Sequence, residues 1–222
     1  MQKKTAMIVG ATGLVASELL QLLLNDSYYR TIITVSRRQL DITHENLVQV
    51  IADYDRLEDI EELLEATDVY CCLGTTMAVA GSKEAFYKVD YTYPVEVAKI
   101  ALKNESSQFL LISAMGANKN SNIFYNRVKG EVEEKIKSLG FPSTHIFRPS
   151  LLLGERKEER KGEKFMQKLS QAAPFLFMGP LAKYRPIKAV DVAKGMIAMA
   201  KKQVVGISTI DSSQIQKLAD TQ

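Results

Sequence analysis

The sequence predicts an α/β fold built on a doubly wound parallel sheet. Short runs rich in β-branched residues alternate with helical patterns along the chain, and this alternation is typical of a parallel sheet with helices on both faces. Most of these runs are almost continuously apolar, as strands covered on both sides should be. A glycine-containing turn directly follows the first run and precedes a helical pattern.

The predicted elements alternate in chain order. Strands are expected at residues 5–10, 31–36, 47–52, 68–74, 108–113, 144–150 and, last, 206–211. Helices are expected at residues 14–24, 56–66, 83–104, 124–139, 163–172 and 190–202. Pro94 should kink the helix at 83–104 because proline lacks the backbone N–H, and Gly140 fits a helix stop. The sequence shows no internal repeat, low-complexity tract or linker, so a single domain over residues 1–222 is predicted.

Composition argues against several classes of protein. The 222 residues are 46% hydrophobic and 25% charged, and the net charge of +3 is dispersed among acids, so neither disorder nor nucleic-acid binding is expected. The opening apolar run is too short for a signal sequence, and no run reaches the roughly 18 apolar residues of a membrane span. Cys71 and Cys72 are expected to be buried thiols in a reducing compartment. We therefore expect a cytoplasmic protein with no membrane partner and no metal site.

The turn after the first strand has the features of a phosphate-binding loop. It reads "GATGLVA" over residues 10–16 and leads into the helix "SELLQLLL". Glycine lets the backbone approach a phosphate closely, and a helix N-terminus supplies free N–H donors at the positive end of its dipole. The spacing Gly10-x-x-Gly13-x-x-Ala16 departs from G-x-G-x-x-G. Its position between strand and helix nevertheless favours phosphate binding over a plain tight turn.

The end of the second strand bears on the choice between NAD(H) and NADP(H). A dinucleotide site that prefers NAD usually carries an acid about 20 residues after the loop, which binds the ribose 2′-hydroxyl. Here the strand ends "VSRRQ", with no acid. Because the planar guanidinium of arginine suits a 2′-phosphate, the sequence predicts NADP(H), bound by Arg37 with Ser36 and Arg38 in support. Ordinary surface arginines are the alternative.

Two Tyr-x-x-x-Lys pairs occur, Tyr125 with Lys129 and Tyr184 with Lys188. Such a short match arises easily by chance. The second pair encloses Pro186, which prevents a regular helical turn, so its side chains have no reason to align. The first pair lies within the helix expected at 124–139.

A helical wheel of residues 124–139 places Tyr125 and Lys129 on the buried face, at its N-terminal end. The apolar residues of that face are Val128, Val132, Ile136 and Leu139. The charged residues expected to point elsewhere are Glu133, Glu134 and Lys137. A lysine on a buried stripe is costly unless something pairs with it, and an active-site floor would be such a place.

A serine completes the pattern for one of the two pairs. Ser113 ends a strand twelve positions before Tyr125, at the carboxyl edge where ligands of doubly wound sheets bind. Carbonyl reduction by hydride requires a proton donor. An adjacent ammonium lowers the pKa of a tyrosine and so brings it closer to neutral pH, where the tyrosine must donate. Ser113 would then polarise the carbonyl oxygen, and Lys129 would also bind the nicotinamide ribose. The alternative is a structural polar patch under a loop.

Several segments together resemble the short-chain dehydrogenase/reductase superfamily, in its atypical NAD(P)-binding branch. They are "GATGLVA", "SRR", "CCLGTT", "SAMGA" followed by "YNRVKGEVE", and "FRPSLLLGER". The similarity runs from about residue 5 to about residue 205 and points to the Tat-interacting-protein-like oxidoreductases, neighbours of the NmrA-like proteins. It implies a Rossmann fold and a catalytic triad of Ser113, Tyr125 and Lys129.

The resemblance also implies a set of cofactor contacts. The pyrophosphate loop would consist of Gly10, Thr12, Gly13, Leu14 and Val15, and Arg37 would select NADP. Asp53 with Tyr54 would lie at the adenine side, and Leu73, Gly74 and Thr75 would form the loop beneath the cofactor. The segment facing the nicotinamide would be Arg148, Pro149 and Ser150. Ala16 stands where the third glycine is more usual. Because this branch includes regulators and sensors, a complete triad does not by itself imply turnover.

Substrate specificity in this fold resides after the sixth strand, here in a substrate-side lid over residues 151–186. It contains the charged run "ERKEERKGEK" and the apolar run "FLFMGPL", which suits a pocket wall, a subunit contact or ordinary packing. We expect an NADPH-dependent reductase of a small carbonyl compound. The sequence leaves open whether the chain forms a homodimer or binds a protein partner. The alternative is an NADP(H)-sensing protein with little turnover. A nucleotide-sugar epimerase or dehydratase is disfavoured because the segment after residue 150 is short.

Overall fold

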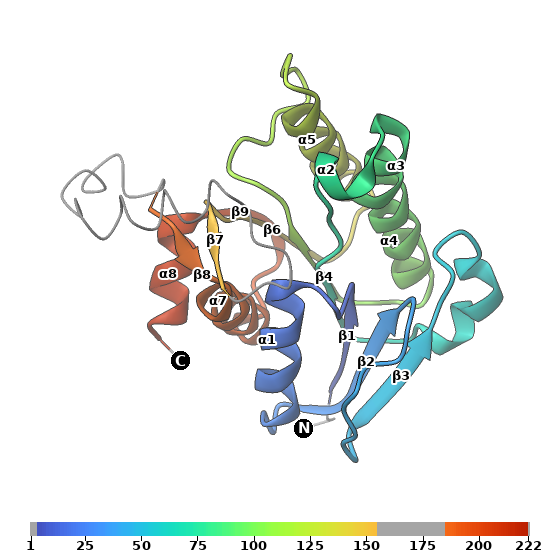
Figure 1. Cartoon of the computed structure of the whole chain (residues 1–222). Coiled ribbons are helices and arrows are strands. Elements are labelled where there is room, and N and C mark those ends of the chain that lie inside the picture. The colour runs from blue at the N-terminus through green and yellow to red at the C-terminus, as the bar shows by residue number, and fades with distance from the viewer. Residues whose placement is uncertain (1–3, 155–184, 222) are drawn as a thin grey trace.

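The computed structural model describes residues 4–154 and 185–221, which build a seven-stranded sheet in the order β3-β2-β1-β4-β5-β6-β9 (Figure 1). Every neighbouring pair of strands is parallel. The strands are β1 (Lys4–Val9), β2 (Tyr29–Ser36), β3 (Leu47–Ile51), β4 (Asp68–Cys71), β5 (Gln108–Ile112), β6 (Ser143–Arg148) and β9 (Gly206–Asp211). The predicted doubly wound parallel sheet is confirmed, including its last strand.

Helices cover both faces of the sheet. On one face, α1 (Leu14–Leu24), α7 (Ala189–Lys202) and α8 (Ser212–Ala219) form an apolar core with β1 and β6. On the other face, the 3₁₀ segment η1 (Leu57–Leu63), α4 (Tyr93–Lys103) and α5 (Phe124–Lys137) form a second core (Figure 1). Two buried layers explain why the strand sequences are almost continuously apolar.

The helix expected at 83–104 is interrupted near Pro94, but by a wider turn instead of a kink. It consists of α3 (Lys83–Tyr87), a π-helical turn η2 (Lys88–Thr92) and α4. Proline donates no hydrogen bond, and its ring crowds the carbonyl four residues earlier, here that of Asp90. The turn before Pro94 opens as a result, and such π-turns occur frequently at functional sites.

Other local differences have ordinary causes. The helix expected at 56–66 is the shorter η1, in which Ile60 has non-helical angles. The structure adds α2 (Met77–Ala80), the short strands β7 (Leu152–Leu153) and β8 (Ile187–Lys188), and α8. The start of α8 is marked in the sequence, because Asp211 and Gln214 have the spacing of a capping box, which they form in the structure.

Some predicted features fall outside the described residues. They include the helix at 163–172, the run "FLFMGPL", Tyr184 and most of the predicted lid. These expectations stay predictions.

Candidate active site

The glycine loop lies between β1 and α1 at the carboxyl edge of the sheet. Gly10 has a φ of +82°, and a Cβ there would lie 3.1 Å from the Cys72 backbone, so only glycine fits without strain. The Gly13 amide donates to the Gly10 carbonyl at 2.9 Å, and Gly13 precedes α1 without a capping side chain. The first-turn amides of α1, among them those of Leu14 and Val15, have no intrahelical acceptor. Thr12 is exposed on this loop.

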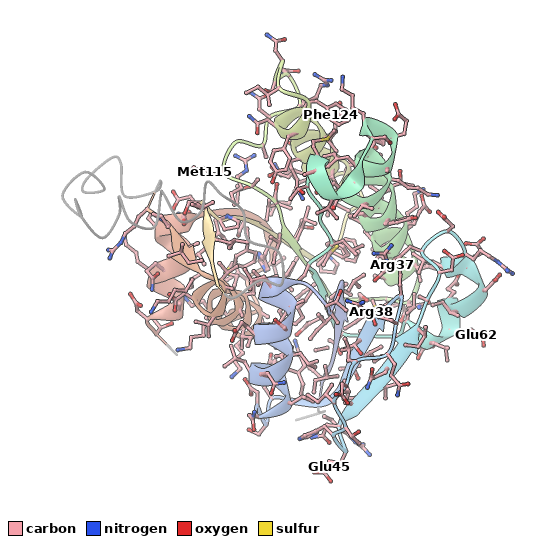
Figure 2. All side chains as sticks on the ribbon, in the orientation of Figure 1. Arg37, Arg38, Glu45, Glu62, Met115 and Phe124 are labelled. Atoms are coloured by element: carbon pink, nitrogen blue, oxygen red, sulfur yellow. The ribbon has the colours of Figure 1, made fainter. Side chains whose placement is uncertain are left out.

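The arginines predicted to select NADP(H) follow β2. The buried Ser36 hydroxyl donates to the Arg38 carbonyl at 2.7 Å and so closes the turn. Arg37 and Arg38 are both exposed, and Figure 2 shows them near the ends of β1 and β2. The positive charges are therefore available to a ligand at the same sheet edge as the glycine loop.

The two residues predicted at the adenine side differ in their environment. Asp53 is exposed, and its carboxylate accepts a hydrogen bond from the Asp55 amide. Tyr54 is buried, its hydroxyl donates to the Val35 carbonyl at 2.8 Å, and its ring stacks on Tyr93 with centroids 5.2 Å apart. Burial raises the pKa of Tyr54 above its ordinary value. Tyr54 can therefore serve as a fixed wall, with its hydroxyl already committed.

A buried carboxylate joins the loop after β4 to α5. One oxygen of Asp90 accepts the Thr75 amide at 2.8 Å, and the other lies 2.7 Å from the Nζ of Lys129. That second contact is close enough for an ion pair but lacks the angles of a hydrogen bond. A Cβ on the exposed Gly74 would lie 3.4 Å from both charged atoms. Gly74 therefore lies against the ion pair, and its neighbour Leu73 is buried.

Tyr125 and Lys129 lie on the first turns of α5. Lys129 is only 5% exposed, whereas Tyr125 is half-buried, with its ring centroid 5.5 Å from that of Phe86. Burial alone would lower the pKa of Lys129, but the charge of Asp90, with Tyr125 contributing, outweighs it and raises that pKa above its ordinary value. Lys129 is therefore a permanent cation at neutral pH, next to a phenol that the described residues leave without a hydrogen bond.

Ser113 belongs to a second buried network. Its hydroxyl lies 2.5 Å from an oxygen of Glu133, and the guanidinium of Arg148 binds both oxygens of the same carboxylate. These hydrogen bonds raise the pKa of Arg148. The prediction that Glu133 points away from the buried face of α5 is wrong, because Glu133 is 1% exposed. The wheel placed Glu133 outside the sector of the apolar residues, and it could not show that Arg148 of β6 pairs with the Glu133 carboxylate.

The segment after Arg148 connects to the C-terminal part of the chain. The Pro149 carbonyl accepts the Met115 amide at 3.2 Å. The hydroxyl of Ser150 donates to the Arg185 carbonyl and lies 3.0 Å from that of Ser212. Ser150 therefore has a structural role in addition to the predicted cofactor contact.

The structure brings the predicted residues together along one edge of the sheet. Arg37 and Arg38 lie toward β2, while Met115 and Phe124 lie toward α5 (Figure 2). Sequence reasoning missed Asp90 and Glu133, which pair with Lys129 and Arg148. The only signal for either was the cost of burying Lys129 unpaired, which demands an acid without saying which one.

Other candidate features lie outside the triad of Ser113, Tyr125 and Lys129, although Tyr54 lines the first of the two cavities. A cavity of about 410 Å³ lies between η1 and α4, and one of about 630 Å³ lies beside α7, β9 and α8; neither is lined by a triad residue. Both cysteines are free, and burial raises the pKa of the Cys71 thiol to about 12. Within residues 4–154 and 185–221, no group of three His, Cys, Asp or Glu side chains could hold a metal ion. In the same ranges no helix has both the length and the apolar character to cross a bilayer.

Comparison with known proteins identifies the family. Residues 10–174 match a family described as NAD(P)H-binding. The chain belongs to the atypical NAD(P)-binding branch of the short-chain dehydrogenases/reductases. It is 35% identical to Protein HTATIP2 of Rattus norvegicus over 78% of this chain and 73% of that one. It is 36% identical to the mitochondrial Protein FMP52 of Candida albicans over 96% and 97% of the two chains.

Solved structures support the fold. MoeE5 in complex with UDP-glucose and NAD has a TM-score of 0.71 at 13% identity, covering 98% of this chain and 81% of that one. A UDP-N-acetylglucosamine 4-epimerase from Methanobrevibacter ruminantium M1 has a TM-score of 0.71 at 15% identity, covering 99% and 81%. At these identities the likeness shows the NAD-binding Rossmann fold and nothing about substrate.

The cytoplasmic prediction is wrong. FMP52 relatives from Candida albicans, Debaryomyces hansenii and Aspergillus niger are named mitochondrial. The prediction excluded secretory signals and membrane helices. Neither test bears on mitochondrial import, which uses amphipathic, arginine-rich segments.

Proposed function

We propose that this chain is an NADP(H)-dependent oxidoreductase that interconverts a small carbonyl compound and its alcohol. The observation that carries the proposal is the position of Tyr125 beside a buried, permanently charged Lys129 on the same sheet edge as the glycine loop. A charged lysine stabilises the phenolate that remains after proton donation. The structural role for this pair is the alternative that the experiment below must exclude.

The residues present fit a dinucleotide. The glycine loop at Gly10, here called the Gly10 cradle, has space that a Cβ would fill. The first-turn amides of α1 have no side-chain cap, and the exposed Arg37 suits a 2′-phosphate. Lys129 would hold the ribose hydroxyls, and Pro149 would adjoin the nicotinamide. A bound nicotinamide supplies the hydride.

The chain itself supplies the proton. Tyr125 donates its phenolic hydrogen to the substrate oxygen as negative charge develops there, and the phenolate that results faces the Lys129 ammonium. In the opposite direction the phenolate takes the hydroxyl hydrogen of the alcohol. Because Lys129 is held by Asp90 at 2.7 Å, the cation need not reorganise during either step.

A second function, NADP(H) sensing with little turnover, is favoured by one observation. Two of the three polar groups of the predicted triad already have partners within the chain, Glu133 for Ser113 and Asp90 for Lys129. In that case cofactor binding would matter and proton transfer would not.

The test compares Tyr125→Phe with the wild type in NADPH oxidation over a panel of small aldehydes and ketones. Loss of one general acid should reduce kcat by about 10²–10⁴-fold while NADPH affinity, measured by calorimetry, stays within about twofold. The matched control is Tyr28→Phe, because Tyr28 is also half-buried but lies at the opposite end of β2. Turnover by Tyr125→Phe at the wild-type rate would contradict the proposal. NADPH binding without turnover on the whole panel would favour the sensor.

A further inference from the structure

The hydrogen-bond directions around Ser113 are fixed by its partners. The Oγ of Ser113 lies 2.5 Å from Oε1 of Glu133, which also accepts Nε of Arg148 at 2.9 Å. The second oxygen, Oε2, accepts Nη2 of Arg148 at 2.5 Å, and the Nζ of Lys137 lies 3.9 Å from it. Ser113 and Glu133 are 5% and 1% exposed, so water does not compete for these contacts.

The chemistry of these groups leaves one arrangement. A guanidinium only donates hydrogen bonds, so both oxygens of Glu133 accept, as a carboxylate does in a two-bond pair with arginine. The Ser113 hydroxyl has a single hydrogen, which the adjacent Glu133 oxygen therefore accepts. Toward any further group, Ser113 offers only its lone pairs.

We propose that Glu133 and Arg148 are positioning residues that hold Ser113 as a hydrogen-bond acceptor, so that the site recognises a hydroxyl group in preference to a carbonyl. This inference rests on the proposed function of the same site. It gives Ser113 a role opposite to that expected from the sequence, in which the serine donates to a carbonyl oxygen.

The preference has an energetic reason. When Tyr125 carries its proton, an alcohol can donate its own hydroxyl hydrogen to Ser113 while the bond from Ser113 to Glu133 stays in place. A carbonyl oxygen can only accept, so Ser113 must first turn its hydrogen away from Glu133 and leave that carboxylate with one bond fewer in a buried site. The alcohol form should therefore bind more tightly than the carbonyl form of the same molecule.

Glu133→Gln separates positioning from mere structural support. Glutamine has the same shape, and its carbonyl oxygen can still accept Arg148 from the position of Oε2, which receives both Nη2 and, at 3.2 Å, Nε. Its amide nitrogen then faces Ser113 and donates to it. The serine hydrogen is freed for a ligand, so the preference should shift toward the carbonyl.

The experiment measures binding in complexes that cannot react. Cyclohexanol is titrated into the NADPH-loaded protein and cyclohexanone into the NADP⁺-loaded protein, with calorimetry or ligand-observed NMR as the readout. The ratio of the two affinities is compared between variants, because the difference between the two cofactor forms then cancels. The matched control is Glu134→Gln, since Glu134 is the exposed neighbour on α5.

The expected ratio favours cyclohexanol in the wild type and moves toward cyclohexanone by about tenfold in Glu133→Gln, the value of one hydrogen bond. Ser113→Ala, which removes the hydroxyl with little change of packing, should also reduce the preference and serves if Glu133→Gln does not fold. Glu134→Gln should keep the wild-type ratio. An unchanged ratio in both Glu133→Gln and Ser113→Ala, or binding of neither ring by the loaded wild type, would overturn the inference.

The outcomes separate this inference from the proposed function. Because the complexes cannot react, a protein without turnover can still show the preference for the alcohol, which would support the inference alone. Turnover that depends on Tyr125, together with an affinity ratio that does not change in Glu133→Gln or Ser113→Ala, would support the proposed function alone.

Discussion

The Nζ of Lys129 lies 2.7 Å from Oδ1 of Asp90, and both side chains are almost completely buried, at 6% and 0% exposed. The two residues are far apart in the sequence, and a π-turn before Pro94 brings the carboxylate into place. In such a site neither charge can be hydrated well, so each depends on the other. Removing one partner should therefore cost far more than the net value of the pair.

Lys129→Met should reduce the free energy of unfolding by about 3–5 kcal/mol, because it leaves Asp90 as an unpaired buried charge. A second substitution, Asp90→Asn, should restore most of that loss, since the asparagine oxygen can still accept the Thr75 amide without carrying a charge. Urea denaturation of the two single variants and the double variant measures the coupling.

The matched control for that cycle is the exposed pair of Lys99 and Glu96, whose atoms are also 2.7 Å apart but whose side chains are 49% and 45% exposed. Lys99→Met should change stability by less than about 1 kcal/mol. If Lys129→Met lowers the free energy of unfolding by no more than Lys99→Met, the buried charge of Asp90 does not depend on Lys129 for its stability.

The fold was predictable because its signals are local. Each buried strand shows as a short apolar run, and the glycine loop lies next to the strand and the helix that define it. The paired acids were not predictable, because a sequence pattern cannot show what a side chain meets across space. The helical wheel placed Glu133 outside the apolar sector of α5, although Glu133 lies four residues after Lys129. Asp90 lies in the π-helical turn before Pro94, and its contact with Lys129 depends on how that turn packs against α5.

His145 should make stability depend on pH. It is fully buried in β6, and neither ring nitrogen has a hydrogen-bond partner in the described part of the chain. Burial lowers the pKa of His145 from 6.5 to about 4. Between these values the unfolded state binds the proton and the folded state does not, so stability rises with pH and is lost as the pH falls from 6.5 to about 4.

His145→Leu should remove that dependence. Between pH 7 and pH 4 the free energy of unfolding should fall in both proteins, but the fall should be smaller in the variant by up to about 3 kcal/mol. Urea denaturation at each pH measures this difference. His44→Gln is the control, because His44 is the other histidine of the chain and is half-buried; it should follow the wild type. A His145→Leu curve parallel to the wild type would show that other groups cause the acid sensitivity.

Gly10 and Gly140 separate backbone strain from steric fit. Both have positive φ, +82° and +87°, but a Cβ at Gly140 meets nothing within 4 Å, whereas one at Gly10 lies 3.1 Å from the Cys72 backbone. Gly140→Ala should cost about 1–2 kcal/mol from strain alone. Gly10→Ala should cost about 1–3 kcal/mol more from overpacking and should also weaken NADPH binding. Equal losses in thermal denaturation and unchanged NADPH affinity would contradict the role given to the Gly10 cradle.

Arg37→Ala tests how the chain distinguishes NADPH from NADH. A hydrogen bond to a charged group contributes about 1.5–3 kcal/mol, so the affinity for NADPH should fall by roughly 10–100-fold. The affinity for NADH should change by less than about twofold, because NADH has no 2′-phosphate. Calorimetric titration of the purified protein with each cofactor measures both values.

Two further variants make the result specific to the guanidinium. Arg37→Lys keeps the charge but loses the planar fork, so it should fall between the wild type and Arg37→Ala for NADPH. Arg30→Ala removes an exposed arginine near the start of β2, at the far end of the same strand, and should bind both cofactors as the wild type does. Equal losses for NADPH and NADH in Arg37→Ala would mean that Arg37 does not read the phosphate. A wild type that prefers NADH would show that the two arginines after β2 do not select the cofactor, while leaving the assignment of Tyr125 and Lys129 intact.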